Sequence, residues 1–205
     1  MRKHLTLALA AGIVAYAGGA QAATAIFAGG CFWSVESNFD SVPGVTETIS
    51  GFIGGHTENP TYNEVAYGGN TGHREAVKIT YDPEVVSYEQ LLMTFWTTTD
   101  PTDAGGQFCD RGDTYHTGIF PVEEGQAEIA AASRDQIAAD TGYTIVTEII
   151  EGQTFYPAED YHQNFHNTNP ERYQAYRIGC GRDPVIERLW GDMAFLGTEA
   201  NPYPD

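Results

Sequence analysis

The stretch Ala23–Phe39, ATAIFAGGCFWSVESNF, changes its pattern at a pair of glycines. It opens with a short apolar run that ends at Gly29-Gly30, and it continues with apolar side chains three and four residues apart, Phe32, Val35 and Phe39. A short apolar run bounded by glycines is typical of a buried strand, and the later spacing is typical of a helix. We therefore expect a strand, a tight turn and a helix that begins at Cys31.

Strands and helices also alternate loosely along the rest of the chain. Alternating apolar residues predict strands at 45–55, 74–83, 116–122 and 144–151. Helical spacing predicts helices at 87–100, with Ser87 as the N-cap, and at about 123–140. We expect an α+β fold, a two-layer sandwich of helices on a mixed sheet with the arrangement of a ferredoxin-like plait.

Two segments show neither period. Residues 101–114 are rich in Gly and Asp, and ordered loops of this length are often functional. The segment from Tyr156 onward is polar and aromatic, with short helices at best. We expect it to form a long irregular C-terminal segment that wraps the core.

Residues 1–22 have the composition of a secretory signal peptide. They combine a basic start, MRKH, with the apolar run LTLALAAGIVAYA and the small-x-small pattern Ala20-Gln21-Ala22. The apolar run is shorter than the roughly 20 residues that cross a bilayer. We expect cleavage near Ala22, export to the periplasm or the medium, and a single catalytic domain over residues 23–205.

The chain is strongly acidic. Its formal net charge of −18 becomes −20 once Arg2 and Lys3 are removed with the leader. Such a charge disfavours nucleic acid and anionic membranes as partners. We expect no nucleic-acid binding, no stable membrane association and a monomer.

The cysteine count is odd, since the chain carries Cys31, Cys109 and Cys180. Any single pairing leaves one thiol over, and a small disulfide scaffold would carry more cysteines, so reactive thiol chemistry is the better hypothesis. Cys31 is the first candidate, because the positive end of a helix dipole favours the nucleophilic thiolate. A buried, unreactive cysteine explains the position equally well from spacing alone.

Five segments together resemble one known family. The motifs GGCFWSVE, NPTYNEV, GHREAVKITYDP, CDRGDTYHTGIF and YPAEDYHQNF are similar, in order, to blocks of the A-type methionine sulfoxide reductases, the peptide-methionine (S)-S-oxide reductases. The resemblance covers nearly all of the chain after the leader. It implies reduction of methionine S-sulfoxide, free or in proteins, and repair of oxidised exported proteins.

The resemblance also implies roles for named residues. Cys31 is the nucleophile that attacks the sulfoxide sulfur, and Phe32 and Trp33 form the cage for the substrate methyl group. Glu75 is the proton donor to the sulfoxide oxygen, which is a poor leaving group until it is protonated. A carboxyl group serves as this acid at neutral pH only if an apolar setting raises its pKa.

Three further residues complete the implied pocket. Tyr62 and Tyr115 match the two phenols that hydrogen-bond the sulfoxide oxygen, and Asp110 matches the acid of the same pocket. Phenols donate hydrogen bonds without adding a charge. The expected product on the enzyme is the sulfenic acid of Cys31.

A second thiol must then resolve the sulfenic acid by forming an intramolecular disulfide. Cys180, in a glycine-flanked segment, is the preferred candidate and Cys109 is the alternative, and both remain open as successive participants. The oxidised enzyme then requires an external thiol reductant, a thioredoxin-like protein or dithiothreitol. We expect no bound cofactor and no metal, because no histidine has metal-ligand spacing with a cysteine.

The chain departs from the family pattern in three places. Phe108-Cys109 stands where the family commonly has Gly-Asn, and the interval between Tyr62 and Glu75 is one residue longer than usual. The tail CGRDPVIERLWGD differs from the better-known tail with two cysteines. These departures bear on the recycling step, not on the first chemical step.

Other functions remain open from the residues themselves. CFWS has the form of a monothiol disulfide oxidoreductase site at a helix start. Cys31 with His162 would make a cysteine hydrolase, although no oxyanion hole is identifiable and His162 is better explained as a structural residue. A binding module for oxidised or apolar side chains is the alternative without catalysis.

Overall fold

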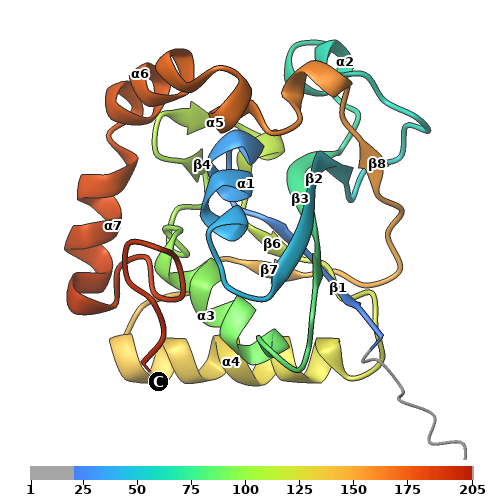
Figure 1. The fold of residues 1–205 in the computed structure, drawn as a ribbon. Helices are drawn as coiled ribbons and strands as arrows, with labels where there is room; N and C mark the ends of the chain where they lie inside the picture. Colours follow the sequence, from blue (N-terminus) through green and yellow to red (C-terminus); the bar gives the residue numbers. More distant parts are fainter. Residues whose placement is uncertain (1–20, 205) are drawn as a thin grey trace, which may run out of the picture.

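The computed structural model describes residues 21–204, and Figure 1 shows their fold. Residues 1–20 of the expected signal peptide lie outside the described residues, and so does Asp205. Within 21–204, no helix combines the length and the apolar character needed to cross a membrane.

A six-stranded mixed sheet forms the centre of the molecule. Its strands follow the order β7-β6-β1-β3-β2-β8. They are β1 (Ala23–Ala28), β2 (Val45–Ile53), β3 (Arg74–Tyr81), β6 (Gly118–Ile119), β7 (Glu148–Ile149) and β8 (Tyr156–Pro157). Only the β6–β7 pair is parallel. The mixed sheet is confirmed, and the ferredoxin-like plait stays a prediction.

Two of the predicted strands are much shorter than their apolar patterns. Only Gly118–Ile119 and Glu148–Ile149 are strands of the sheet, and single backbone hydrogen bonds, from Phe120 to Ile26 and from Ile150 to Ile119, extend them. The segment 101–114 is not wholly irregular, since it contains a separate hairpin of β4 (Gly106–Gln107) and β5 (Asp110–Arg111). The tip of this hairpin is Phe108-Cys109.

Seven α-helices accompany the sheet in the described part of the chain. They are α1 (Phe32–Asp40), α2 (Tyr62–Ala66), α3 (Tyr88–Thr97), α4 (Gln126–Thr141), α5 (Phe165–Thr168), α6 (Pro170–Cys180) and α7 (Arg182–Trp190). Ser87 caps α3 as predicted, in a reciprocal capping box with Gln90. Single-turn 3₁₀ helices are η1 (Asp113–Tyr115), η2 (Asp160–His162) and η3 (Gly191–Met193).

The strand-turn-helix unit at the start of the mature chain forms as its pattern predicts. Helix α1 packs on β2 and β3, and Phe27 of β1 stacks between Phe39 of α1 and Phe95 of α3. On β3, alternate residues face this core, so Val77 and Ile79 are fully buried. Glu75 lies two residues before Val77 and therefore faces the same side.

The C-terminal segment is more regular than expected. Instead of an irregular wrap, α6 and α7 form two consecutive helices along one side of the molecule (Figure 1). Gly181, in the left-handed conformation, ends α6 and begins α7. Their buried residues are sparse, one in α6 (Tyr173) and three in α7 (Arg182, Ile186 and Trp190). So few buried residues do not produce the repeating apolar pattern by which an amphipathic helix is recognised in a sequence.

Candidate active site

Cys31 is the N-cap of α1 and lies at the end of the glycine turn. Gly30 has a positive φ of 83°, and a Cβ atom there would lie 2.5 Å from Cβ of Gln107. Only glycine fits at this position, because the turn packs directly against strand β4. Cys31 itself is buried, with 7% of its surface exposed, and it forms no disulfide.

Glu75 reaches the N-terminus of α1 from strand β3. The backbone N–H of Phe32 donates a hydrogen bond of 2.9 Å to Oε2 of Glu75. Burial raises the pKa of the Glu75 carboxyl to about 8, the bond from Phe32 partly opposes this, and the charge of Asp110 adds to it. The site thus holds a carboxyl group that stays protonated at neutral pH, as the predicted proton donor requires.

Two phenols and a second carboxyl group stand around the same point. Tyr62 begins α2, Tyr115 ends η1, and a hydrogen bond from Thr114 to the Val65 carbonyl ties the two elements together. Burial raises the pKa of Tyr62 and of Tyr115 above its ordinary value, and the charge of Glu75 raises both further. Both phenols therefore remain neutral hydrogen-bond donors.

Asp110 is joined to the site through a residue that sequence reasoning missed. Tyr176 of α6 donates a hydrogen bond of 2.5 Å to Oδ2 of Asp110. Burial raises the pKa of Asp110, while the Tyr176 hydroxyl and the charge of Arg182 oppose the shift. The Tyr176 hydroxyl also acts on Cys31, where it lowers the pKa of the thiol.

Aromatic rings form the wall beside Cys31. Phe32 is fully buried, whereas Trp33 is partly exposed and stacks on Phe165 with ring centroids 3.8 Å apart. The Trp33 indole N–H donates to Nδ1 of His162 at 3.2 Å. His162 thus orients the aromatic wall in this structure, which agrees with a structural histidine.

The state of Cys31 differs from the sequence expectation. Burial chiefly, then the charges of Glu75 and Asp110, raise the pKa of the Cys31 thiol well above its ordinary value. The Tyr176 hydroxyl and the backbone N–H of Trp33 oppose this shift only in part, and the first N–H of α1, from Phe32, is taken up by Glu75. The resting thiol is therefore neutral, and the thiolate must form during the reaction.

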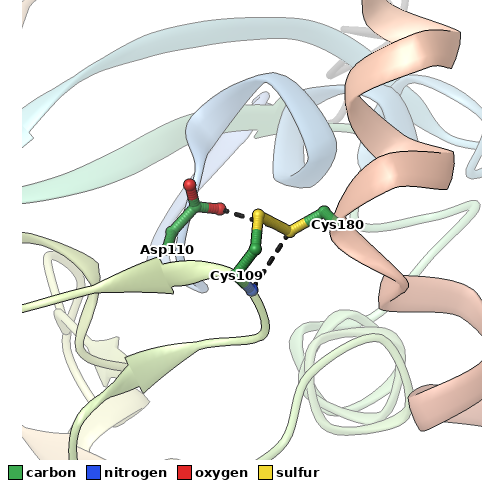
Figure 2. Close-up of side chains that lie close together, drawn as sticks. All are labelled: Cys109, Asp110 and Cys180. Atoms are coloured by element: carbon green, nitrogen blue, oxygen red, sulfur yellow. Dashed lines mark hydrogen bonds between the residues drawn. A yellow bond between two sulfur atoms is a disulfide. The ribbon is translucent and has the colours of Figure 1, made fainter.

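Cys109 and Cys180 form a disulfide. Figure 2 shows it where the tip of the β4–β5 hairpin meets the end of α6, next to the carboxyl group of Asp110. The sulfur of Cys180 lies 3.8 Å from Oδ2 of Asp110, and the sulfur of Cys109 belongs to an exposed residue. Cys180 is thus not in a loose tail segment but ends a helix, one turn beyond Tyr176.

The predicted residues therefore gather at one place, from elements far apart in the chain. Cys31, Glu75, Tyr62, Tyr115 and Asp110 influence one another's pKa values in this structure. Cys109, Asp110 and Cys180 also form a cluster of metal-ligand types, but its two sulfurs are bonded to each other. Tyr176 and the buried Arg182 are the additions that the sequence did not reveal, since both stand in a polar stretch without a clear period.

Comparison with known proteins agrees with this geometry. The family model described as "Peptide methionine sulfoxide reductase" matches residues 23–194. The peptide methionine sulfoxide reductase MsrA 2 of Rhizobium meliloti (strain 1021) is 54% identical over 174 residues, 85% of this chain and 86% of that protein.

Solved structures show the same relationship. Methionine sulfoxide reductase A of Corynebacterium diphtheriae is 34% identical, with a TM-score of 0.65 over 76% of this chain and 77% of that one. Mxr1 from Saccharomyces cerevisiae, in complex with Trx2, has the same fold at 19% identity, with a TM-score of 0.51 over 75% of this chain and 90% of that one. The chain therefore belongs to the A-type methionine sulfoxide reductases, the enzymes that reduce peptide methionine sulfoxide.

Proposed function

We propose that Cys31 reduces methionine S-sulfoxide by direct attack on the sulfoxide sulfur, with Glu75 as the acid. The observation that carries this is the neutral Glu75 carboxyl, held by the first N–H of the helix that Cys31 begins. Such an acid donates a proton to the sulfoxide oxygen as the sulfur–sulfur bond forms. Tyr62 and Tyr115 hold the same oxygen as neutral donors, and Phe32 and Trp33 receive the methyl group.

The first step balances as an oxygen transfer. The transient bond between the two sulfurs and the bond between the methionine sulfur and its oxygen both break, and the hydroxyl oxygen bonds to the sulfur of Cys31. The thiol of Cys31 is thereby oxidised by two electrons to sulfenic acid, and the sulfoxide is reduced to methionine. Glu75 donates one proton to the oxygen, and the proton lost from the Cys31 thiol restores it. Because the resting thiol is neutral, no net proton enters or leaves the site in this step.

For recycling, we favour Cys180 as the thiol that attacks the sulfenic acid. It lies beside Asp110 and on the same helix as Tyr176, whereas Cys109 lies at the exposed hairpin tip. Attack by Cys180 releases water and forms a Cys31–Cys180 disulfide. Attack by Cys109 on Cys180 then frees Cys31 and leaves the Cys109–Cys180 pair seen here.

An external dithiol then reduces the Cys109–Cys180 disulfide. Cys109 is the better point of attack, since its residue is exposed and Cys180 is half-buried. Mxr1, which shares the fold, has been solved in complex with Trx2. We infer that a thioredoxin-like protein, or dithiothreitol in its place, serves as the reductant of this monomeric enzyme.

A single turnover without reductant tests this route. The fully reduced chain is mixed with one equivalent of free methionine sulfoxide, and its cysteines are mapped by mass spectrometry. We expect one equivalent of methionine, a Cys109–Cys180 disulfide and a free Cys31. Cys109→Ser is expected to stop at a Cys31–Cys180 disulfide, and Cys180→Ser at a sulfenic acid that dimedone traps.

Two outcomes would overturn parts of this proposal. Fast formation of a Cys31–Cys109 disulfide in the Cys180→Ser chain would reverse the order of the two resolving cysteines. No change in any thiol would contradict the reaction itself. The monothiol oxidoreductase alternative is tested in parallel, since it expects faster reduction of a model disulfide than of methionine sulfoxide.

The compartment is a separate part of the proposal. The basic start, apolar run and small-x-small pattern of residues 1–22 support export and a role in repairing oxidised exported proteins. We expect a bacterial host that produces the full chain to yield a protein beginning near Ala23 in the extracytoplasmic fraction. Arg2→Glu with Lys3→Glu should retain uncleaved chain in the cytosol, and recovery of the unaltered chain there alone would refute export.

A further inference from the structure

Arg182 is the most deeply buried cation among residues 21–204. It is the first residue of α7, and only 1% of its surface is exposed. In the part of the chain that the structure describes, no carboxylate lies within ion-pair distance of it. A buried charge without a counter-ion is costly, so such a group calls for an explanation in terms of what it faces.

The guanidinium of Arg182 is fixed against the backbone that carries the nucleophile. Its Nη2 donates to the carbonyl oxygens of Gly29 at 2.9 Å and of Thr98 at 3.1 Å. Its Nη1 lies 3.7 Å from the point where a Cβ of Gly30 would stand. Gly29 and Gly30 are the two residues directly before Cys31, so the charge sits at the turn that presents the thiol.

Part of the donor capacity of Arg182 is unused. Nε and Nη1 are buried and have no hydrogen-bond partner. The face of the guanidinium lies over the ring of Phe108, with the two centres 4.5 Å apart. An aromatic ring and two carbonyl oxygens hold the group in place, but none of them neutralises its charge.

Within the described residues, the groups that act on the Cys31 charge from the other packed elements are acids. The titratable groups that face it are Glu75 from β3, Asp110 from β5, Tyr115 from η1 and Tyr176 from α6, and none of these is a cation. Arg182 from α7 is the cation that acts on this cluster, since its charge opposes the rise in the pKa of Asp110 and also interacts with the charge of Cys31. The chemistry requires a thiolate at the sulfoxide sulfur, and α1 offers it the N–H of Trp33 but not that of Phe32, which Glu75 accepts.

We propose that Arg182 is a positioning residue whose buried guanidinium provides the counter-charge of the Cys31 thiolate and holds the glycine turn that presents it. The inference rests on the proposed role of Cys31 as the nucleophile. It assigns a role in the first chemical step to a residue that is two positions after the resolving Cys180.

The disulfide form of the enzyme allows a direct test, because Cys31 is then the one free thiol. Its ionisation is followed by the pH dependence of alkylation with iodoacetamide and by the ultraviolet absorbance of the thiolate. We expect Arg182→Gln to move the midpoint upward by about one pH unit or more, as loss of a nearby opposite charge does. Alkylation at a fixed pH below the midpoint should then slow by about 10-fold.

Two further variants separate charge from shape. Arg182→Lys keeps the charge, so its midpoint is expected to lie close to that of the unaltered enzyme, although lysine contacts only one of the carbonyl oxygens of Gly29 and Thr98. Arg177→Gln is the matched control, since Arg177 lies on α6 but is paired with Asp183. We expect it to leave the midpoint of Cys31 where it is.

The proposal fails if Arg182→Gln and Arg182→Lys have the same pH midpoint of Cys31 ionisation. It also fails if Arg182→Gln keeps the midpoint of the unaltered enzyme. An arginine with only a structural role predicts both results. Arg182→Met, with an apolar stem of similar length, replaces Arg182→Gln if the latter does not fold. Failure of the proposed function is recognised separately, by turnover that survives Cys31→Ser.

Discussion

Replacing Cys31 by serine is expected to abolish sulfoxide reduction, with a rate loss of more than about 10⁴-fold, the size seen when a nucleophile is removed. A serine hydroxyl forms neither the nucleophilic anion at neutral pH nor the counterpart of a sulfenic acid. Neither of the other cysteines replaces it opposite the acid, because Glu75 is bound at the start of the helix that Cys31 begins, whereas Cys109 and Cys180 stand on the hairpin tip and at the end of α6. The measurement is methionine formation from free methionine sulfoxide with dithiothreitol present.

The matched control keeps Cys31 and removes the other two thiols. Cys109→Ser with Cys180→Ser should form one equivalent of methionine at the single-turnover rate of the unaltered enzyme. Turnover at full rate in the Cys31→Ser chain would refute the assignment of the nucleophile, whatever the state of the other two cysteines.

The second large effect concerns the acid. Glu75→Gln is expected to lower the single-turnover rate by about 10²–10⁴-fold, the usual contribution of a positioned general acid. The amide still accepts the hydrogen bond from Phe32, so the start of α1 is preserved while the transferable proton is lost. Stopped-flow or quenched-flow measurement of methionine formation, without reductant, isolates this step from recycling.

The pH dependence gives the same residue a second signature. Burial raises the pKa of Glu75 to about 8, so the acid form is present below that pH and is lost above it. The single-turnover rate of the unaltered enzyme should therefore contain a limb that falls as the pH rises through about 8. Glu75→Gln should lack this limb.

Glu36 of α1 provides the matched control, because it is another buried carboxyl group and burial raises its pKa to about 7. Glu36→Gln is expected to leave the limb in place. If Glu36→Gln lost the falling limb and Glu75→Gln kept it, the proton donor would be Glu36 and not Glu75.

Much of the central fold was predictable because its patterns are local. The apolar run before Gly29, the helical spacing after Cys31 and the capping residue Ser87 all form as expected. The side of the sheet on which Glu75 lies also follows from its alternation with Val77 along β3. The alternation alone does not predict that Glu75 contacts the N-terminus of α1.

The recycling half of the site was less predictable because it depends on contacts between distant segments. The sequence left three pairings of its cysteines open, and the observed one joins residues 71 positions apart. It requires the hairpin tip to meet the end of α6, a helix whose narrow buried stripe is hard to recognise. The same folding buries Arg182 and brings Tyr176 to Asp110, so polar residues in a polar stretch became part of the site.

The register of the β2–β3 pair has a consequence for how this chain tolerates changes in length. Phe52 stands opposite Glu75, and the register shift in this pair lies near the far end, between Val45 and Glu47. A one-residue slip of β3 would exchange the two faces and send the carboxyl group to the opposite side of the sheet. An additional residue between Tyr62 and Glu75 is harmless as long as the coil before Arg74 absorbs it. We therefore expect insertions to be tolerated in that coil and to be disruptive within β3.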